Sequence, residues 1–592
     1  MTEPSSQTWY AAAAVTPERP ALTHDLDVDV CVVGAGLAGL TVAREVARRG
    51  WSVTVLEAGT VAGGASGRNA GFVSPGFAER IDAIVARVGL PRAKELWALS
   101  EAGVEYVRRT ISETAMAGVE PRDGRLSVRR TDDEAALIEH VAMLRVDFGV
   151  DVEAWPTDQV REVLRSPYYF QAAHYLKAFH LHPLNYALGL AADAETHGAR
   201  IFQNTRAVEV DPAGVRKRVQ TPHGTVRARH VVLAGSTGIG TIDEQLAETV
   251  LPVSTYVAVT APLGERLFDA VRYSGAVADT RRAGDYYRIV EDDRLLWGGR
   301  ISTSMSEPRR LKAQLRHDIL KVYPQLGDVE IESAWAGTMA YAVHKMPQIG
   351  ELAPGYWLAS AFGGHGLNTT AMAGELIARA ILEGDDRWRL FSSYELVWAG
   401  GALGRAAAQA SLWWMQRRES LRERISRYRD RARREADARH AKWEAEKVAR
   451  KAEAEARRAA EEARRIAEAE ARRLAAEDAR RLAAEKARLA REEVERIRRE
   501  RELAAEAARH AEEEAARVAA EQALQDATAT LARRAEEQAA VTPMTGAATA
   551  APELAPVAEV AIGEKPKRKR GARKPRERKK KNEVSEPVPP AT

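Results

Sequence analysis

Near the start of the chain, the spacing of apolar residues predicts a strand, a helix and a second strand. Residues 28–33 are mostly apolar, as in a buried strand, and residues 53–56 repeat this pattern. Between them the apolar residues recur as they do on one face of a helix: Leu40, Val42, Ala43, Val46 and Ala47. Gly50 is expected to end this helix.

A further helix is predicted within and after the stretch FGGHGLNTTAMAGE, which occupies residues 362–375. The residues of its apolar face are Met372, Leu376, Ile377, Ala380 and Ile381. Asn368 or Thr369 is expected to cap its N-terminus, and Gly384 is expected to end it.

Three glycines surround a histidine just before this helix. Gly363, Gly364 and Gly366 would let the backbone come close to a flat or bulky group. A helix N-terminus carries free N–H donors and partial positive charge, so it attracts an electron-rich group. The stretch around His365 therefore predicts half of a binding site.

The pattern changes after residue 430. Residues 431–540 contain no Gly or Pro, and Ala, Arg and Glu predominate. The repeat ARRIAEAE-ARRLAAED-ARRLAAEK places its large apolar residues eight positions apart, so they drift by about 80° around a helix at each repeat. Such a stripe is too thin for a leucine-rich coiled coil, and we expect a solvated single helix, with an alanine-lined coiled coil as the alternative.

Charge differs between the segments of the chain. Residues 1–430 carry slightly more acidic than basic side chains, which argues against a catalytic domain built around a nucleic acid. Residues 541–592 begin as a linker typical of disorder and contain the dense basic cluster KPKRKRGARKPRERKKK at 565–581. This cluster could bind a polyanion, either nucleic-acid phosphate or an anionic membrane surface, or it could be a solvated tail.

Cysteine usage and hydropathy indicate a cytoplasmic protein. The chain has one cysteine, Cys31, which excludes a disulfide framework and is expected to be a small core residue. The N-terminus lacks a basic region followed by an apolar run, so no signal peptide is expected. No uninterrupted apolar stretch reaches about 18 residues, so no transmembrane segment is expected.

The glycines of the first predicted turn identify a dinucleotide site. Gly34, Gly36 and Gly39 lie between the first strand and the helix, and the second strand stops at the acid Glu57. In this arrangement the glycines permit a tight turn, approach to a pyrophosphate and close helix packing, while the acid accepts ribose hydroxyls. A second loop of small residues, GTVAGGASGRNAGF, follows where such sheets bind ligands.

Taken together, the motifs of the sequence resemble those of the D-amino-acid-oxidase-like (DAO) FAD-dependent oxidoreductases. The resemblance covers about residues 8–430 and is carried, in order, by VVGAGLAGLTVAREVARRG, ASGRNAG, YYRIVEDDRLLWGGR, WAGTMAYAVHKMPQIG and FGGHGLNTTAMAGE. It is nearest to the branch that contains gamma-glutamylputrescine oxidase, because of the WYAA entry and the ASGRN loop. The family implies a Rossmann-like FAD-binding domain with an antiparallel-sheet substrate domain, a two-domain α/β flavoprotein.

The resemblance assigns cofactor-binding roles residue by residue. The residues that it implies for FAD are Gly34, Gly36 and Gly39 at the pyrophosphate, Glu57 at the ribose, Ser66, Arg68, Asn69 and Gly71 beside the isoalloxazine, Val208 at the adenine, Gly235 at a second nucleotide-contacting turn, and Gly363, Gly364, His365, Gly366 and Leu367 under the pyrimidine edge. Some relatives tether the flavin through Cys or His. Neither occurs in VAGGASGRNAGF, so FAD is expected to be non-covalent.

The resemblance also implies the chemistry. A small-molecule amine or amino-acid derivative would transfer a hydride to flavin N5, the imine would hydrolyse, and O2 would reoxidise the flavin and give H2O2. The run HKMPQIG lacks the arginine that clamps a carboxylate in amino-acid oxidases, so an amine without a nearby carboxylate is favoured. Arg288 is either a carboxylate partner or a solvent-facing arginine of an edge strand. The catalytic candidates are His365 and Lys345, as positive charges that activate oxygen.

Two other features leave alternatives open. His180 and His182 have a spacing that a metal could use, but no third ligand is apparent, so no metal site is expected. The alternative function is a scaffold or anchoring protein with an inherited oxidase fold whose basic tail binds polyanions.

The predicted organisation is an oxidoreductase over 1–430, a charged helical spacer over 431–540 and a disordered basic tail over 541–592. The expected FAD-binding parts are 25–85, 184–245 and 345–385, the substrate domain is 86–183 and 246–344, and a C-terminal helix occupies 391–430.

Overall fold

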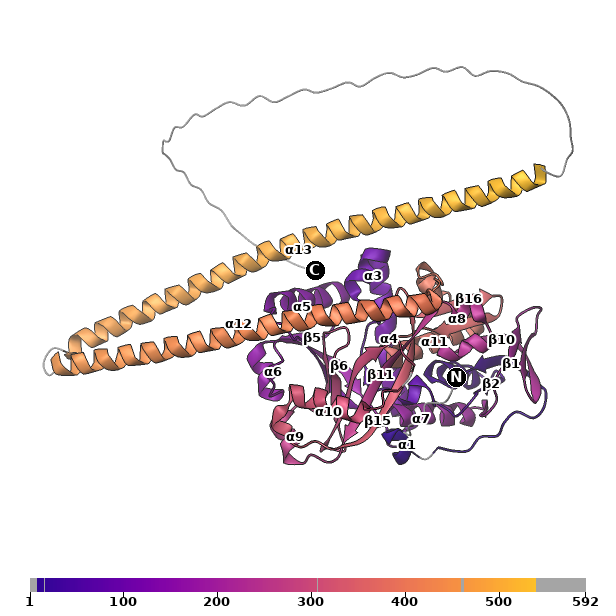
Figure 1. Cartoon of the computed structure of the whole chain (residues 1–592), viewed down its shortest axis with the longest axis horizontal. Helices are drawn as coiled ribbons and strands as arrows, with labels where there is room; N and C mark the ends of the chain where they lie inside the picture. Colours follow the sequence, from indigo (N-terminus) through magenta and orange to yellow (C-terminus); the bar gives the residue numbers. More distant parts are fainter. Residues whose placement is uncertain (1–7, 15, 306, 459–462, 539–592) are drawn as a thin grey trace, which may run out of the picture. The chain divides into compact units, whose positions relative to one another are not determined.

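The computed structural model of the protein describes residues 8–14, 16–305, 307–458 and 463–538. The linker and the basic cluster at 565–581 therefore lie outside the described residues. Two sheets with helices packed against them form the part before residue 400 (Figure 1). The mixed α/β fold class is confirmed.

The first sheet has a parallel core of buried apolar strands. Its strands are, in order across the sheet, β16 (Gln348–Ala353), β17 (Tyr356–Ser360), β10 (Gly224–Leu233), β1 (Leu26–Val33), β2 (Val53–Leu56) and β7 (Arg200–Phe202), with β9 (Lys217–Thr221) beside β10 and β8 (Glu209–Asp211) beside β9. β1 pairs in parallel with β10 and β2, and β10 pairs in parallel with β17. Parallel strands direct their carboxyl ends to one edge, where such sheets bind ligands.

The second sheet is mostly antiparallel. Its strands are, in order, β15 (Ile331–Ala342), β11 (Val250–Thr260), β14 (Arg294–Ser302), β13 (Tyr286–Val290), β12 (Ala276–Asp279), β4 (Arg122–Val128), β6 (Ala172–His180) and β3 (Phe72–Val73), with β5 (Val152–Trp155) beside β6. Alternate residues of its strands face two different apolar cores. Leu126 and Tyr287 belong to one core, whereas Tyr175 and Val290 belong to the core shared with the first sheet.

Helices pack on the sheets, and several of them share the core on one face of the first sheet. They are α1 (Trp9–Ala13), α2 (Leu37–Arg48), α3 (Ile81–Val88), α4 (Leu90–Thr114), α5 (Glu134–Phe148), α6 (Thr157–Val163), α7 (Pro183–Thr196), α8 (Glu244–Ala247), α9 (Glu265–Ala270), α10 (Leu311–Val322), α11 (Gly366–Glu383), α12 (Gly401–Arg458) and α13 (Ala463–Gln538), with short 3₁₀ turns η1 (Ala65–Gly67), η2 (Ser236–Thr241), η3 (Pro324–Leu326) and η4 (Arg387–Ser393). α4 approaches α11 so closely that a Cβ at Gly103 would lie 2.1 Å from the Asn368 carbonyl oxygen.

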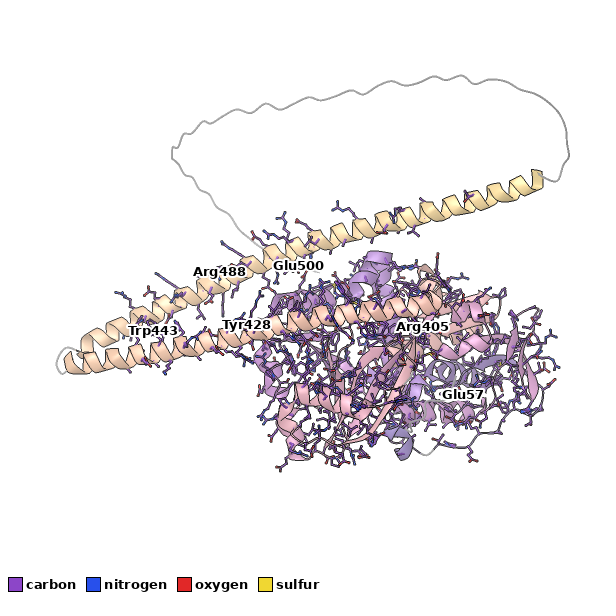
Figure 2. The ribbon with its side chains drawn as sticks, in the orientation of Figure 1. Glu57, Arg405, Tyr428, Trp443, Arg488 and Glu500 are labelled. Atoms are coloured by element: carbon purple, nitrogen blue, oxygen red, sulfur yellow. The ribbon has the colours of Figure 1, made fainter. Side chains whose placement is uncertain are left out.

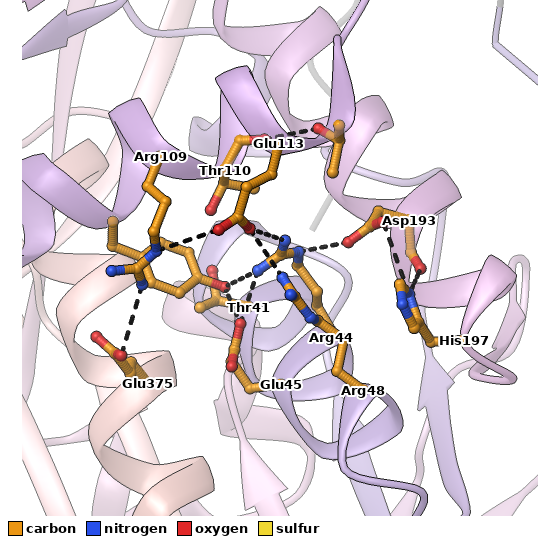
Figure 3. A network of polar contacts seen from close by, with 12 residues as sticks. Thr41, Arg44, Glu45, Arg48, Arg109, Thr110, Glu113, Asp193, His197 and Glu375 are labelled. Carbon is orange, nitrogen blue, oxygen red and sulfur yellow. Dashed lines mark hydrogen bonds and ion pairs between the residues drawn. The ribbon is translucent and has the colours of Figure 1, made fainter.

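A buried arginine ties the helix that follows the glycine turn to its neighbours (Figure 3). Arg44 of α2 is 1% exposed and donates to Asp193 of α7 at 2.5 Å, to Glu45 at 2.7 Å and to the Tyr106 hydroxyl of α4 at 3.0 Å. A buried guanidinium is tolerated only when it is paired and hydrogen-bonded. This network therefore fixes α2 relative to α4 and α7.

Two details differ from the sequence-based expectations. β3 joins the second sheet by pairing with β6, although it lies within the expected FAD-binding part 25–85. The helix expected from residue 391 begins at Gly401, because η4 buries Phe391 and the left-handed φ of Gly400, 83°, separates the turn from the helix.

The C-terminal helical region packs at its start against the two-sheet part of the chain before residue 400, which we call the catalytic body. α12 runs without a break from Gly401 through the expected boundary at 430 to Arg458 (Figure 1). The chain divides into two units, Met1–Arg517 and Val518–Thr592, and the division falls within α13. The boundaries at 430 and 540 and the choice between single helix and coiled coil stay predictions. No helix in the described ranges is both long and apolar enough to cross a membrane.

One carboxylate of α12 enters a buried charge cluster of the second sheet. Glu423 is 4% exposed and lies 3.6 Å from Arg130 and 3.4 Å from Arg281. Arg281 also pairs with Asp279 and Asp285, at 2.5 Å from each. The first part of α12 therefore supplies a carboxylate that pairs with two buried arginines of the catalytic body.

Two truncated chains test this role. A chain that ends after Arg434 should purify with flavin and unfold within a few degrees of the full-length protein, because it keeps Glu423 and Asp430. A chain that ends after Gly400 should be strongly destabilised, since losing one partner of a buried ion pair costs about 3–5 kcal/mol. Thermal unfolding and flavin content measure both. Equal stability of the two truncated chains would contradict the role assigned to Glu423.

Candidate functional site

The glycine turn after β1 brings three chain segments together. Gly34 has a φ of 109°, and a Cβ there would lie 2.8 Å from the Ala234 carbonyl oxygen at the end of β10. A Cβ at Gly39 would lie 2.1 Å from the Gly34 carbonyl oxygen, so only glycine permits this contact between helix and strand. A Cβ at Gly36 would meet only the Ser66 hydroxyl, at 3.0 Å. The turn is therefore closed on its packed side and open at Gly36.

Glu57 stabilises this turn from the end of β2. Its two carboxylate oxygens accept hydrogen bonds from the Ala35 N–H at 2.8 Å and the Gly59 N–H at 2.9 Å. The Ser66 hydroxyl similarly accepts from the Leu37 N–H at 3.0 Å. A carboxylate has further acceptor positions, so Glu57 can hold the turn and still accept a ribose hydroxyl. Figure 2 labels Glu57 within the first-sheet region.

The ASGRNAG loop is held in shape by its own side chains. The Asn69 amide donates to the Ala65 and Ser66 carbonyl oxygens and accepts from the Gly71 N–H at 2.8 Å. Arg68 is buried and donates to the Ala336 carbonyl oxygen at 2.8 Å. Asn69 therefore shapes the loop, and Arg68 joins it to β15.

Arg288 anchors the same loop from the second sheet. It lies on β13, an interior strand, and is 5% exposed, so the interpretation as a solvent-facing edge-strand arginine is wrong. Its three nitrogens contact the Ala70 carbonyl oxygen at 2.8 Å, His180 Nδ1 at 3.2 Å and the Tyr10 hydroxyl at 3.4 Å. Arg288 is thereby occupied in positioning the loop and the N-terminal segment. Its alternative role as a carboxylate partner stays a prediction.

The two histidines of FHLHP have structural partners. His180 Nε2 donates to the Ser274 carbonyl oxygen at 3.0 Å, which leaves Nδ1 to accept from Arg288. Burial, with Arg288 adding to it, lowers the pKa of His180 to about 3. His182 Nδ1 caps α7 by accepting from the Asn185 N–H. Among the described residues, no group of three His, Cys, Asp or Glu could hold a metal ion.

The second glycine cluster opens onto the start of α11. His365 is the N-cap residue and its side chain makes no capping hydrogen bond, whereas the candidates Asn368 and Thr369 lie inside the helix and do not serve as caps. Asn368 instead donates to the Gly76 carbonyl oxygen. A Cβ at Gly364 would lie 3.0 Å from the Tyr341 hydroxyl, and a Cβ at Gly366 would meet no atom within 4 Å. The helix therefore begins at Gly366 and Leu367 with open space beside its N-terminus.

His365 is uncharged in this setting. Burial, together with the nearby guanidinium of Arg125, lowers the pKa of the His365 imidazole to about 3. The imidazole can therefore donate or accept a hydrogen bond but carries no charge at neutral pH. Lys345 forms an ion pair with Glu79, whose two carboxylate oxygens lie 3.1 and 3.2 Å from Lys345 Nζ. Their roles in oxygen activation stay predictions.

Arg125 is a functional candidate that the sequence did not reveal. It lies on β4 opposite Tyr175 of β6, with its guanidinium 5.5 Å from that ring. Its Nε is buried without a hydrogen-bond partner in the described part of the chain. Burial lowers the pKa of Arg125, and the groups that oppose this are Tyr175 and Tyr273 rather than carboxylates. A solitary arginine inside a strand carries no motif, so only the fold could place it near His365.

The backbone expected at the adenine already makes one hydrogen bond within the protein. The Val208 N–H donates to the Gln220 carbonyl oxygen at 2.8 Å, so it is already used. The preceding Ala207 is buried, and among the described residues its N–H has no partner. Gly235, by contrast, lies beside Gly34, because a Cβ at Gly34 would approach the Gly235 Cα to 3.1 Å.

The profile of the DAO family, described as FAD dependent oxidoreductase, matches residues 29–380. The chain belongs to this family. It is 33% identical over 387 residues to a probable oxidoreductase OrdL of Haemophilus influenzae, covering 64% of this chain and 88% of that protein. It is 32% identical over 400 residues to the gamma-glutamylputrescine oxidoreductase of Escherichia coli, covering 66% and 92%. The chain is therefore an FAD-dependent oxidoreductase.

Solved structures share the fold. Glycine oxidase from Geobacillus kaustophilus aligns with a TM-score of 0.53 at 20% identity, covering 63% of this chain and 99% of that chain. L-proline dehydrogenase from P. horikoshii aligns with a TM-score of 0.52 at 19% identity, covering 63% and 100%. Both likenesses support the two-sheet architecture.

The residues present fit FAD. The open glycine at Gly36 leaves room for a pyrophosphate, Glu57 has acceptor capacity for a ribose, and the uncapped α11 N-terminus faces open space at Gly366. Gly36 and Glu57 lie together at the first turn, and the start of α11 adds an open site on another segment of the chain.

Two glycine variants separate binding from folding. In Gly36→Val the new side chain should occupy the pyrophosphate space, so the protein should fold but purify without FAD. Gly36 has extended backbone (φ −80°), which valine also adopts. Gly39→Val should instead lose both flavin and stability, because its Cβ collides with the Gly34 carbonyl oxygen. Flavin absorbance and thermal unfolding of the apoprotein distinguish the two. Full flavin occupancy in Gly36→Val would refute the assignment.

Proposed function

We propose that the protein oxidises a carbon–nitrogen bond of a small amine or amino-acid derivative with non-covalent FAD. The observation that carries this proposal is the N-terminus of α11, which lies beside Tyr341 and near Arg125 and has open space at Gly366. When bound, FAD accepts a hydride from the amine-bearing carbon, and we propose O2 as the final acceptor, with H2O2 as product. The relative named gamma-glutamylputrescine oxidoreductase supports an amine substrate.

The chain's own groups would stabilise the reduced cofactor. A helix N-terminus favours negative charge, and the free N–H groups at Gly366 and Leu367 offer donors to the electron-rich edge of the ring system. Neutral His365 can add a hydrogen bond without adding charge. The anchored ASGRNAG loop, held by Asn69 and Arg288, provides the opposite wall. We assign the adenine contact to the backbone of Ala207 and Val208.

Non-covalent binding has support in the sequence of the loop. VAGGASGRNAGF contains neither Cys nor His, the residues that tether flavins in relatives. Cys31, the sole cysteine, is buried in β1, and burial raises the pKa of its thiol, so it stays protonated. The cytoplasmic location and the polyanion partner of the basic cluster 565–581 stay predictions.

Anaerobic reduction tests the proposed function. The purified protein should be yellow, its flavin should be released by denaturation, and its visible absorbance should bleach when a substrate amine is added without oxygen. Readmitted air should restore the colour and generate peroxide. A panel of polyamines and their glutamyl derivatives is suitable, with Gly36→Val as the flavin-free control. A flavin-loaded protein that no amine in this panel reduces would contradict the proposal.

Arg125 suggests that the amine also carries a carboxylate. The Arg125 side chain is partly buried, and its Nε has no hydrogen-bond partner in the described part of the chain, so an anionic ligand could supply one. The aromatic rings of Tyr175 and Tyr273 border the guanidinium and would exclude water from the contact. We therefore propose that Arg125 receives a carboxylate of the substrate, a role that the run HKMPQIG does not supply.

Paired substrates test Arg125. In Arg125→Met, the KM for a carboxylate-bearing amine should rise about tenfold or more, because a hydrogen bond to a charged group contributes about 1.5–3 kcal/mol. The methyl ester of the same amine should lose little, and Arg125→Lys should recover part of the effect. The Kd of benzoate, read from perturbation of the flavin spectrum, should rise in parallel. Exposed Arg310→Met is the control. Equal losses for acid and ester would reject the carboxylate role and leave the amine oxidation standing.

A further inference from the structure

The first part of α12 has two chemically different faces. All the acidic residues of segment 401–430 point to the catalytic body: Glu419 accepts from the Arg282 N–H, Glu423 pairs with Arg130, and Asp430 pairs with Arg161 at 3.2 Å. The opposite face therefore has no acidic side chain of its own segment.

Large apolar side chains form a stripe on this opposite face. Trp414, Leu421 and Tyr428 are seven residues apart, close to two helical turns, and are 63%, 59% and 75% exposed. Leu403 and Ile425 lie on the same side and are also exposed, and Trp413 borders the stripe. Figure 2 labels Tyr428 on α12. The side chains are large and come from one continuous helix, so the stripe forms a contiguous surface rather than scattered exposed residues.

Exposed arginines flank the stripe on both sides. These residues are Arg417, Arg418, Arg422, Arg424 and Arg429. In the described part of the chain none of the five forms an ion pair, although the Arg418 guanidinium lies 5.6 Å from the Trp414 ring. Trp413, Trp414 and Leu421 line one open pocket together with Arg417 and Arg424. We call these apolar and basic residues of 403–429 the arginine–tryptophan face.

We propose that the arginine–tryptophan face binds the surface of an anionic lipid bilayer. A helix that carries Trp and Leu on one side and arginine along both borders lies in the plane of a membrane interface. There the apolar side chains enter the acyl boundary and the guanidinium groups remain at the lipid phosphates. No helix in the described ranges could span the bilayer, so the contact would be peripheral.

Two other partners fit the surface less well. A second copy of the chain, related by a two-fold axis, would bring the five unpaired arginines against their own counterparts, which is unfavourable. A nucleic acid could use the arginines and stack on the aromatic rings, but Leu403, Leu421 and Ile425 would gain nothing from a phosphate backbone. Lipid is the partner that satisfies the aliphatic, aromatic and cationic groups together.

Vesicle binding by the full-length, flavin-loaded protein tests the proposal. It should co-sediment with vesicles of phosphatidylcholine and phosphatidylglycerol and much less with phosphatidylcholine alone, and added salt should weaken the binding. The double variant Trp413→Ser/Trp414→Ser should weaken binding by about tenfold or more, since it removes the apolar anchors. Trp443→Ser is the matched control, because Trp443 is 54% exposed further along the same helix.

A charge variant and a deletion locate the contact. Arg417→Glu/Arg424→Glu should weaken binding to anionic vesicles as strongly as the tryptophan variant does, while flavin content and amine oxidation stay at the wild-type level. Deletion of 565–581 should leave a substantial part of the binding in place. Binding that disappears with this deletion and ignores the tryptophan variant would overturn the proposal. So would a dimer that these variants dissociate, oligonucleotide binding without vesicle binding, or equal binding to neutral vesicles.

Discussion

The contact between the backbone of Gly34 and Gly39 is the constraint on which the site depends. Since no side chain fits between them, α2 starts directly against the end of β1, and its first N–H groups face the carboxyl edge of the parallel sheet. The same turn excludes a side chain toward Ala234, which draws in the end of β10. Arg44 then fixes the far part of α2 through charged partners on α4 and α7.

The spacing of apolar residues and glycines predicted the elements that depend only on neighbouring residues in the chain. The strand at 53–56 and the end of α11 at Gly384 lie where apolar spacing and glycine placed them. The glycines of the first turn and the acid Glu57 were identified together because their spacing follows from one turn of backbone. Their contacts with Ser66 and Gly235, however, join segments far apart in the chain.

The remaining features depend on which segments meet. An edge strand was one of two alternatives for Arg288, and it is wrong because β12 lies beside β13, which the sequence does not reveal. The sequence does not reveal Arg125, because its importance depends on the groups around it: within the described ranges, tyrosines rather than carboxylates oppose its pKa shift. The N-cap of α11 was misjudged for a related reason: Asn368 finds a better partner in the Gly76 carbonyl oxygen, a long-range contact, than in its own helix.

The order of strands in the first sheet has a consequence for synthesis on the ribosome. β1 pairs with β10, and β10 pairs with β17, so these two pairings can form only after the later strands have been translated. Once α11 has emerged, every segment of the flavin pocket is available, while all of α12 and α13 still has to be made. At about 5–20 residues per second, the residues of α12 and α13 take about 7–28 s. The residues of the cofactor site are therefore all synthesised before α12 adds Glu423 to the buried charge cluster.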